Sequence, residues 1–378
     1  MDANIKHQPL PLQTEEETIA WLRLVRSEGI GPVTFYSLLD KFGSASEVLY
    51  AIPDFAKKSG RKKPLAIFTE EKALKEYTFL KNYGARLVLA NDINYPEALK
   101  ALSDAPPVLS VKGIASLNQP TLAIVGARNA SLNGQNFAAK IAKDLGNFGW
   151  SIASGLARGI DTAAHKGALE TGTIAIVAGG IDHIYPPKNA RLYYQIAEKG
   201  IIVSEAPFGT LPQASFFPRR NRIISGISRG VVIIEAALKS GSLITARTAL
   251  DQGREILVVP GAPFDPRSQG CNCLIRQGAT LIQSAEDILE SLSPQFIFPS
   301  ALDSLQSIDV PSTSSDLDLA SAHKIILKNL NYSPIGLDEL AQQCQMCPKT
   351  MRFARLELEL AGELQRYPGN RVALVFNG

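Results

Sequence analysis

The sequence has little of what metal-binding or disulfide-bonded proteins need. Among its 378 residues there are only four cysteines and four histidines. The cysteines form two close pairs about seventy residues apart, Cys271 with Cys273 and Cys344 with Cys347. A zinc site built from both pairs would have to join two predicted domains, and the alternative is that all four are reduced cytosolic thiols. We therefore predict no metal site.

Long apolar runs and common nucleotide-binding motifs are also absent. No stretch is long enough to span a membrane, and the first residues carry no apolar run of the signal-peptide type, so we expect a cytoplasmic protein. The Gly-x-Gly-x-x-Gly pattern does not follow the first predicted strand, which argues against an NAD site. A Walker A motif is missing too. No cofactor is predicted, and no ATPase activity.

What the chain does contain is enough apolar material for several cores. Hydrophobic residues make up 45% of it, charged residues 20%, and the net charge of +3 still permits a strong local basic patch. We expect four parts: a helical N-terminal domain over 1–85, an α/β domain over 86–292, a linker rich in serine and proline over 293–318, and a small domain over 319–378.

The N-terminal part predicts short helices. Apolar residues at helical spacing over 17–27 and 33–42 flank the turn Gly29-Ile30-Gly31. Two helices around such a turn resemble a helix-hairpin-helix unit, in which backbone N–H groups face a phosphate. A helical packing module without a ligand fits the same residues, and the sequence leaves both interpretations open.

Between residues 120 and 260, apolar strand-length runs alternate with helical stretches. Continuous apolar runs fit strands that are buried on both faces, and the alternation predicts a Rossmann-like, doubly wound, mostly parallel α/β sheet. In such a sheet, ligands bind beyond the carboxyl ends of the strands. The runs cover 122–125, 151–153, 173–178, 201–203, 231–234 and 256–259.

The loops that follow these strands predict an anionic ligand at one edge of the sheet. Glycines permit close approach of a backbone, helix N-termini attract anions, and arginine binds phosphate with two hydrogen bonds. For the two arginines, an ion pair with Asp161, Asp182 or Glu205 is the alternative. The candidate residues are Gly126, Arg128, Ser154, Gly155, Arg158, Ser240, Gly241 and Ser242.

The segment 216–222, Phe-Phe-Pro-Arg-Arg-Asn-Arg, is the sharpest feature of the chain. A helix that starts at its proline places Arg219 and Arg222 on the polar face and Arg220 over the sheet edge. Aromatic rings beside arginines are typical of single-stranded DNA binding, where bases stack and phosphates are neutralised. We expect Phe217 to stack on a base and at least one of the two phenylalanines to pack in the core.

Catalytic arrangements are not evident. Asp161 and His165 lie four residues apart on one predicted helix with Ser154 nearby, but no nucleophile elbow accompanies them. We therefore predict a binding protein rather than an enzyme. The alternative is a small-nucleotide hydrolase or nucleotide sensor in which Glu235, after the fifth strand, acts as acid and base.

Taken in order, these motifs resemble the DNA processing protein A family, called DprA or Smf. The resemblance is strong over 120–285 and less specific in the flanking segments. It implies a bacterial cytoplasmic homodimer that binds single-stranded DNA, loads RecA onto it and protects incoming strands in natural transformation. The matching motifs are Gly126-Ala-Arg128, Ser154-Gly-Leu-Ala-Arg-Gly-Ile-Asp161, Tyr185-Pro, Ser204-Glu205, Phe217-Pro-Arg-Arg-Asn-Arg222, Glu235-Ala, Ser240-Gly-Ser-Leu-Ile-Thr-Ala246 and Val259-Pro-Gly261.

The resemblance also implies roles for single residues. By motif, the DNA contacts are Arg128, Phe217, Arg220, Asn221 and Arg222, and the dimer surface includes Leu274, Ile275 and Leu281. Many members of the family carry lysine three residues before the phenylalanine, where this chain has Ala214. Arg219 is our candidate for supplying the missing charge.

The last sixty residues predict three helices and a hairpin, the pattern of a winged helix. The third helix, over 348–361, carries Lys349, Arg352 and Arg355 on one side, and three glutamates follow closely. Contact with duplex DNA and contact with another protein both fit this charge pattern.

Overall fold

The computed structural model describes residues 14–58 and 66–292, and parts of the chain between 319 and 374. Two compact units are present, Met1–Ile297 and Phe298–Gly378. The predicted linker over 293–318 lies outside the described residues. No helix in the described part of the chain is long and apolar enough to cross a membrane.

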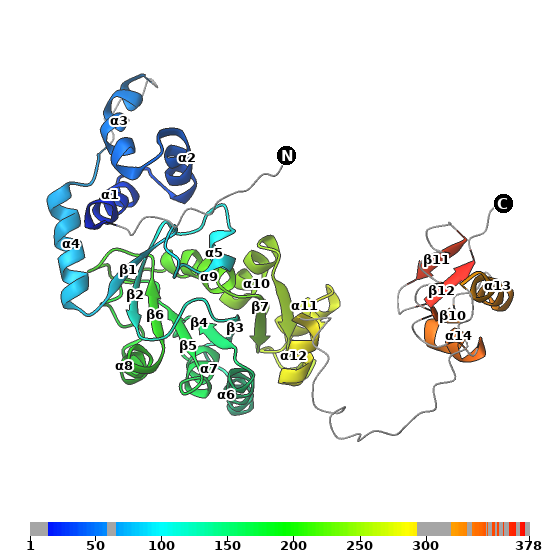
Figure 1. The fold of residues 1–378 in the computed structure, drawn as a ribbon. Coiled ribbons are helices and arrows are strands. Elements are labelled where there is room, and N and C mark those ends of the chain that lie inside the picture. The colour runs from blue at the N-terminus through cyan, green and yellow to red at the C-terminus, as the bar shows by residue number, and fades with distance from the viewer. Residues whose placement is uncertain are drawn as a thin grey trace, which may run out of the picture. The chain divides into compact units, whose positions relative to one another are not determined.

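Four helices precede the sheet (Figure 1). The first two match the predicted helices on either side of the glycine turn. Thr14 caps the first helix by accepting a hydrogen bond from the N–H of Glu17, and Pro32 opens the second helix after Gly31. The rings of Trp21 and Phe35 pack 4.9 Å apart between them. The helices are α1 (Glu15–Arg26), α2 (Pro32–Phe42), α3 (Ala45–Lys58) and α4 (Glu70–Asn82).

A sheet of nine strands forms the centre of the first unit. Its order is β1-β2-β6-β5-β4-β3-β7-β8-β9. The last seven strands in this order pair in parallel, and β2 and β1 add an antiparallel edge beside β6. The six predicted runs are β3 to β8. The strands are β1 (Arg86–Leu89), β2 (Val108–Gly113), β3 (Thr121–Gly126), β4 (Ser151–Ser154), β5 (Thr173–Ile176), β6 (Ile201–Ser204), β7 (Gly230–Ile234), β8 (Glu255–Val258) and β9 (Thr280–Leu281).

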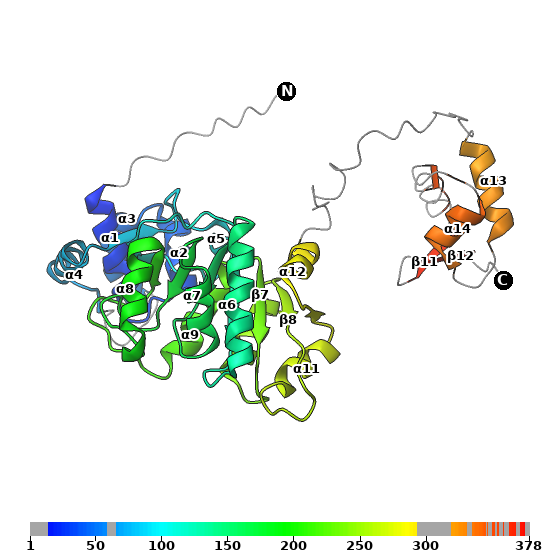
Figure 2. The same ribbon diagram turned by 90° about the horizontal axis from the view of Figure 1, so that it is seen from below.

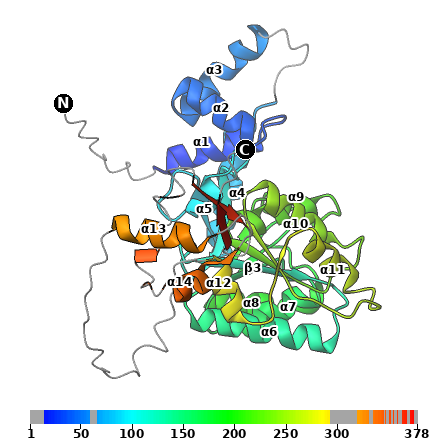
Figure 3. The same cartoon turned by 90° about the vertical axis from the view of Figure 1, so that its right-hand side faces the viewer.

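Helices cover both faces of this sheet, which confirms the doubly wound arrangement (Figures 2 and 3). On one face lie α6 (Leu132–Asn147), α7 (Ile160–Gly167), α8 (Ala190–Lys199) and α12 (Ala285–Leu292). On the other face lie α5 (Glu97–Lys100), α9 (Phe216–Gly226), α10 (Gly241–Asp251) and α11 (Gln269–Arg276).

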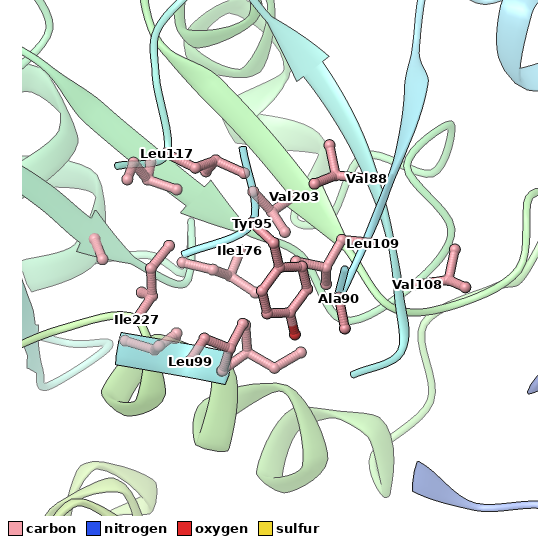
Figure 4. Close-up of a cluster of buried hydrophobic side chains, with 14 of the residues drawn as sticks. Val88, Ala90, Tyr95, Leu99, Val108, Leu109, Leu117, Ile176, Val203 and Ile227 are labelled. Atoms are coloured by element: carbon pink, nitrogen blue, oxygen red, sulfur yellow. The ribbon is translucent and has the colours of Figure 1, made fainter. Parts of the chain in front are cut away.

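A dense apolar core holds α9 against the sheet (Figure 4). Tyr95, Leu99 and Ile176 are fully buried in it, and the Tyr95 hydroxyl donates to the Pro106 carbonyl over 2.7 Å. Helix α5 comes so close to α9 that a Cβ at Gly226 would lie 2.7 Å from a methyl group of Leu99. The position of α9, and of the side chains at its N-terminus, is therefore fixed by packing.

The second unit contains α13 (Leu319–Asn329), α14 (Leu337–Gln343) and a small antiparallel sheet. The sheet has the order β10-β12-β11, formed by β10 (Ile335–Gly336), β11 (Leu364–Tyr367) and β12 (Arg371–Leu374). Ile326, Leu340 and Val372 are buried in its core. The predicted cations Lys349, Arg352 and Arg355 lie outside the described residues.

Candidate nucleic-acid interface

Two glycines bring the loops after β3 and β4 together at the carboxyl edge of the sheet. A Cβ at Gly126 would overlap the Ile234 carbonyl, so only glycine lets β3 lie this close to the end of β7. Gly159 adopts a φ of 76°, and a Cβ there would overlap the Ala127 carbonyl. The two loops therefore interlock, and Arg128 and Arg158, one from each, line the same pocket.

We call this the cation pocket. It has a volume of about 350 Å³, and its lining among the described residues contains three basic side chains and no carboxylate. Among the residues that the structure describes, neither arginine forms an ion pair, so the alternative pairing with Asp161, Asp182 or Glu205 is not observed. The lining residues are Arg128, Gly155, Ala157, Arg158, Tyr185, Pro186, Pro187, Lys188 and Phe217.

Aromatic rings form one wall of the cation pocket. The centroids of the Phe217 and Tyr185 rings lie 5.5 Å apart with a tilt of 60°, and Tyr185 is 47% exposed. The Arg128 guanidinium lies 5.2 Å from the centre of the Phe217 ring, within cation–π range. Phe216, the preceding residue, lines a different pocket, together with Glu205 and Arg219. Both phenylalanines are half-buried and neither belongs to the buried core, so the expectation that at least one packs there is wrong.

Arg220 lies beneath the cation pocket. Only 6% of it is exposed, and its Nη1 donates to the Gly155 carbonyl over 2.7 Å and to the Ile176 carbonyl, which ties together the ends of β4 and β5. Burial lowers the pKa of Arg220 to about 10, so it stays protonated at neutral pH. Asp161 accepts the N–H groups of Gly155 (3.1 Å) and Ala157 (3.3 Å); burial raises its pKa, and the nearby Arg220 opposes that rise.

Gly155 connects this buried charge to the pocket above it. A Cβ at Gly155 would lie 2.6 Å from the Arg220 guanidinium and 2.8 Å from the Asp161 carboxylate. The loop can therefore close over the two charged groups only as glycine. Arg220 was expected to point over the sheet edge, and it does, but as a buried support of the loop that carries Arg158.

The possible triad of Ser154, Asp161 and His165 does not assemble. The Ser154 hydroxyl is fully buried and donates to the Ile124 carbonyl over 2.6 Å. His165 is also fully buried, and its Nδ1 lies 2.7 Å from the Thr173 hydroxyl. Burial and the positive charge of Arg220 lower the pKa of His165 to about 3. Ser154 and His165 therefore make structural contacts with neighbouring strands and are not exposed to a substrate.

Helix α9 begins at Phe216, slightly before the predicted start, so the proline stands in its first turn. Its two other arginines share one partner, Glu205. Arg219 is 59% exposed and places its Nε 3.1 Å from the Glu205 carboxylate, whereas Arg222 is 12% exposed and donates to that carboxylate and to the Asp104 carbonyl. Only Arg219 therefore presents its charge to solvent.

Asn221 and the segment Ser240–Ser242, which are also predicted site residues, make structural contacts near the sheet edge. Asn221 bridges α9 and α10 by donating to the Thr245 hydroxyl over 2.9 Å. At the start of α10, the Ser240 hydroxyl accepts the N–H of Ser242 over 3.2 Å, so this helix end is capped by its own serine. Neither group, nor Gly241 between the serines, is among the residues that line the cation pocket.

Strand order reverses between β3 and β7, the place where Rossmann-like sheets bind nucleotides. A carboxylate fills it here. Glu235, with a φ of 53°, accepts the backbone N–H of Ser131 over 2.8 Å and also the Ser131 hydroxyl, at the N-terminus of α6. A Cβ at Gly134 would lie 2.7 Å from this carboxyl group. The helix end that would hold a nucleotide phosphate is thus occupied.

Sequence reasoning did not single out every residue of the site. Lys188, the third cation of the pocket, follows Pro186 and Pro187 in a short 3-10 helix, Pro187–Asn189, where no periodic pattern marks it. Tyr185 stands out in the sequence only as part of the Tyr185-Pro motif. Pairing of Arg222 with Asp104 joins segments 118 residues apart, which no local signal reveals.

The remaining predictions concern metal and the dimer surface. In the described ranges, no group of three His, Cys, Asp or Glu side chains could hold a metal ion, and Cys271, Cys273 and Cys344 are free. Leu274 is 9% exposed in α11, and Leu281 is 45% exposed in the edge strand β9.

Comparison with protein families gives three matches along the chain. The family of DNA recombination-mediator protein A matches residues 86–293, a DprA-like N-terminal HHH domain matches 15–78, and a DprA winged helix domain matches 310–370. These matches confirm the predicted fold class for all three parts.

Individual proteins agree with the family matches. The chain is 40% identical to Protein Smf of Escherichia coli over 304 residues, which cover 78% of this chain and 79% of that protein. It is 45% identical to DNA processing protein DprA of Bacillus subtilis over 213 residues, 55% of this chain and 72% of that one. The structure of DNA processing protein A from Streptococcus pneumoniae superposes with a TM-score of 0.65 at 34% identity, covering 75% of this chain and 99% of that chain.

A second solved structure concerns ligand binding directly. It reports the single-stranded DNA binding mode of DNA processing protein A from Helicobacter pylori. That chain is 31% identical and superposes with a TM-score of 0.51, over 55% of this chain and 95% of its own length.

Proposed function

Because the chain belongs to the family of DNA recombination-mediator protein A, we propose that it binds single-stranded DNA in the cation pocket, without catalysing a reaction. The single-stranded DNA binding mode reported for the Helicobacter pylori relative supports the choice of ligand.

The carrying observation is the composition of the cation pocket. Arg128, Arg158 and Lys188 face one space that no carboxylate lines in the described part of the chain, and Phe217 and Tyr185 offer ring surface beside them. Positive groups neutralise phosphates, and aromatic rings stack on unpaired bases of any sequence. This combination suits a single strand better than a small anion, because a small anion would contact the cations but not the aromatic rings.

The predicted contact residues divide into two groups under this proposal. Arg128, Arg158, Phe217 and Arg219 contact the strand directly, because their side chains reach solvent at the sheet edge. The others shape that edge: Gly126, Ser154, Gly155, Arg220, Asn221 and Arg222 hold the loops, and Ser240, Gly241 and Ser242 would serve a strand that extends past the pocket. Arg219 supplies the charge that Ala214 lacks.

The wider role follows the family. We propose that the protein loads RecA onto the bound strand, that it protects incoming strands in natural transformation, and that it works in the cytoplasm as a homodimer. Ile275 and Leu281 are proposed for the dimer surface because α11 and β9 lie at the edge of the described sheet, where Ile275 is half-buried and Leu281 is 45% exposed. Leu274 packs in the core beneath them, so its proposed contribution is to support that surface.

A small-nucleotide hydrolase or sensor is the weaker alternative. Its phosphate site would be the N-terminus of α6 at the strand-order reversal, and the Glu235 carboxylate already accepts the Ser131 donors there. Turnover of a nucleoside monophosphate that disappears in Glu235→Gln would favour this alternative over DNA binding.

Fluorescence anisotropy with labelled oligothymidine tests the proposal. Wild type is expected to bind the single strand more tightly than a duplex of equal length. The double variant Arg128→Ala, Arg158→Ala should lose at least about 10-fold in affinity for each arginine, and its log–log salt slope should become shallower by roughly 0.7 per lost phosphate contact.

The matched control removes the same charge elsewhere. Lys140 is 71% exposed on α6 and Lys199 is 44% exposed at the end of α8, and neither lines the cation pocket. Lys140→Ala combined with Lys199→Ala should leave binding nearly unchanged. Equal losses in both double variants, or none in either, would show that the strand binds elsewhere.

A further inference from the structure

Glu205 occupies an unusual position beside the proposed DNA site. It follows β6 at the carboxyl edge of the sheet, and its side chain is only 11% exposed. Both of its bound cations belong to the arginine-rich start of α9, Arg219 and Arg222. A carboxylate that pairs with arginines beside a phosphate-binding site lowers the affinity of that site, because it competes with phosphate for the same cations.

The two partners are held very differently. Arg222 has 12% of its side chain exposed and is also fixed by Asp104, through the backbone carbonyl and a carboxylate 3.7 Å away. Arg219 is 59% exposed, and in the described part of the chain its one hydrogen bond goes from Nε to Glu205, over 3.1 Å. Only Arg219 can turn from the carboxylate to another anion without leaving a buried charge unpaired.

The backbone that carries Glu205 is held by the N-terminal helices, and its carboxylate stays paired with Arg222 when Arg219 leaves. The Glu205 carbonyl accepts a hydrogen bond from Arg26 of α1 over 3.2 Å, and Arg26 is paired with Glu76 of α4 at 3.0 Å. The side chains of that pair are 9% and 8% exposed. Glu76 also accepts the N–H of Phe208 over 3.3 Å, so the N-terminal helices hold the loop after β6 at Glu205 and again three residues later.

We propose that Glu205 is a built-in competitor of the DNA backbone: it binds Arg219 in the free protein, and a phosphate of the strand takes Arg219 from it on binding. This inference rests on the proposed binding of single-stranded DNA. It makes Glu205 a positioning residue that lowers affinity, and it gives the N-terminal helices a role in setting that affinity through the clamp on the Glu205 loop.

The geometry at the α9 terminus agrees with this exchange. Glu205, Arg219 and Phe216 line a pocket of about 220 Å³, and the next residue, Phe217, lines the cation pocket. Arg219 follows Phe217 by two residues in the first turn of α9, so under the proposal a strand that crosses this terminus brings a phosphate next to the stacked base within reach of Arg219. The exchange involves no covalent step, only one ion pair replaced by another.

The test is a gain of affinity, which a merely structural role would not produce. Glu205→Gln should bind oligothymidine about 3- to 10-fold more tightly at low salt, because one repelling charge is removed and Arg219 starts free. Its salt slope should differ from that of wild type by less than about 0.7, the increment of one phosphate contact, because Arg219 contacts a phosphate in both complexes. Glu170→Gln, an equal charge change at a residue 72% exposed and paired with Lys199, should bind like wild type.

A double-mutant cycle assigns the effect to Arg219. In the Arg219→Ala background, Glu205→Gln should give less than half of its gain. A folded Glu205→Gln that binds no better than wild type overturns the inference and leaves the proposed function intact. A gain that persists in full without Arg219 also overturns it.

The wild-type protein offers an independent measurement if Glu205→Gln does not fold. In a crystal structure with bound oligothymidine, the Arg219 guanidinium should lie on a phosphate and more than hydrogen-bond distance from Glu205, while Arg222 keeps its contacts with Glu205 and Asp104. An unbroken pair between Arg219 and Glu205 in that complex refutes the exchange. A wild type that binds no single strand at all removes the proposed function together with this inference.

Discussion

Phe217 allows base stacking to be separated from phosphate binding. Its ring is half-buried, with Tyr185 at 5.5 Å on one side and the Arg128 guanidinium at 5.2 Å from its centre. Part of the ring surface is therefore already used, and one base at most can stack on it. Stacking contributes about 1–3 kcal/mol per base, so we expect Phe217→Ala to cost about 1–1.5 kcal/mol, or roughly 5- to 13-fold in affinity.

The assay is anisotropy with oligothymidine over a range of salt concentrations. Because Phe217 carries no charge, its loss should leave the log–log salt slope unchanged, whereas Arg128→Ala should flatten that slope by roughly 0.7. An abasic strand has the same phosphates without bases, and on it Phe217→Ala should bind like wild type. Phe148→Ala is the matched control: Phe148 is 49% exposed at the far end of α6.

Two results would contradict this reasoning. If Phe217→Ala weakens binding to the abasic strand as much as to oligothymidine, the ring acts only by holding Arg128 in place. If the substitution has no effect on either strand while the protein remains folded, the bases do not enter the cation pocket.

Three other predictions concern stability and assembly. Arg26→Met should destabilise the protein by about 3–5 kcal/mol in urea unfolding, because it leaves Glu76 buried without its cation, whereas Lys81→Met, which removes an ion pair with Glu15 whose side chains are 55% and 60% exposed, should have a far smaller effect. The pKa of His165 falls from 6.5 to about 3 on folding, so below pH 6.5 the unfolded chain binds a proton that the folded protein does not. The free energy of unfolding should therefore fall by up to about 1.4 kcal/mol per pH unit below pH 6.5. Thermal unfolding of His165→Gln between about pH 7 and 5 should depend less on pH than that of wild type. Ile275→Glu combined with Leu281→Glu should yield monomers in light scattering, while Leu250→Glu, 58% exposed on α10, should not; a monomeric wild type would contradict the dimer proposal.

The strands of the central sheet could be predicted because their sequence pattern has one physical cause. Runs such as 231–234 are apolar throughout since both faces of the strand are covered by helices. The glycine loops could be placed at one edge for the same reason, because parallel strands all end there. The antiparallel edge strand β1 carries the apolar run Leu87-Val-Leu-Ala90, but a run of four residues does not by itself distinguish a strand from a buried helical segment, and β1 stands outside the regular alternation of strands and helices that identifies β3 to β8.

The roles of the arginines in the segment 216–222 could not be read from the sequence. Helical periodicity places Arg219 and Arg222 on one face, but their exposure differs because Asp104 and Glu205 arrive from distant segments. Arg220 is buried because the carbonyl ends of β4 and β5 need a donor there. Those partners depend on tertiary contacts, which local spacing does not encode.

The aromatic wall of the cation pocket explains why the site should favour a single strand over a duplex. Phosphates are present in both, so Arg128, Arg158 and Lys188 attract both. The aromatic wall distinguishes them, since a base can reach Phe217 only if it is unstacked from its neighbours. A duplex would have to unpair and flip that base, at a cost of a few kcal/mol, before gaining the single stacking contact that the half-buried ring offers. Phe217→Ala should therefore reduce the preference for single-stranded over duplex DNA, while the protein still binds both.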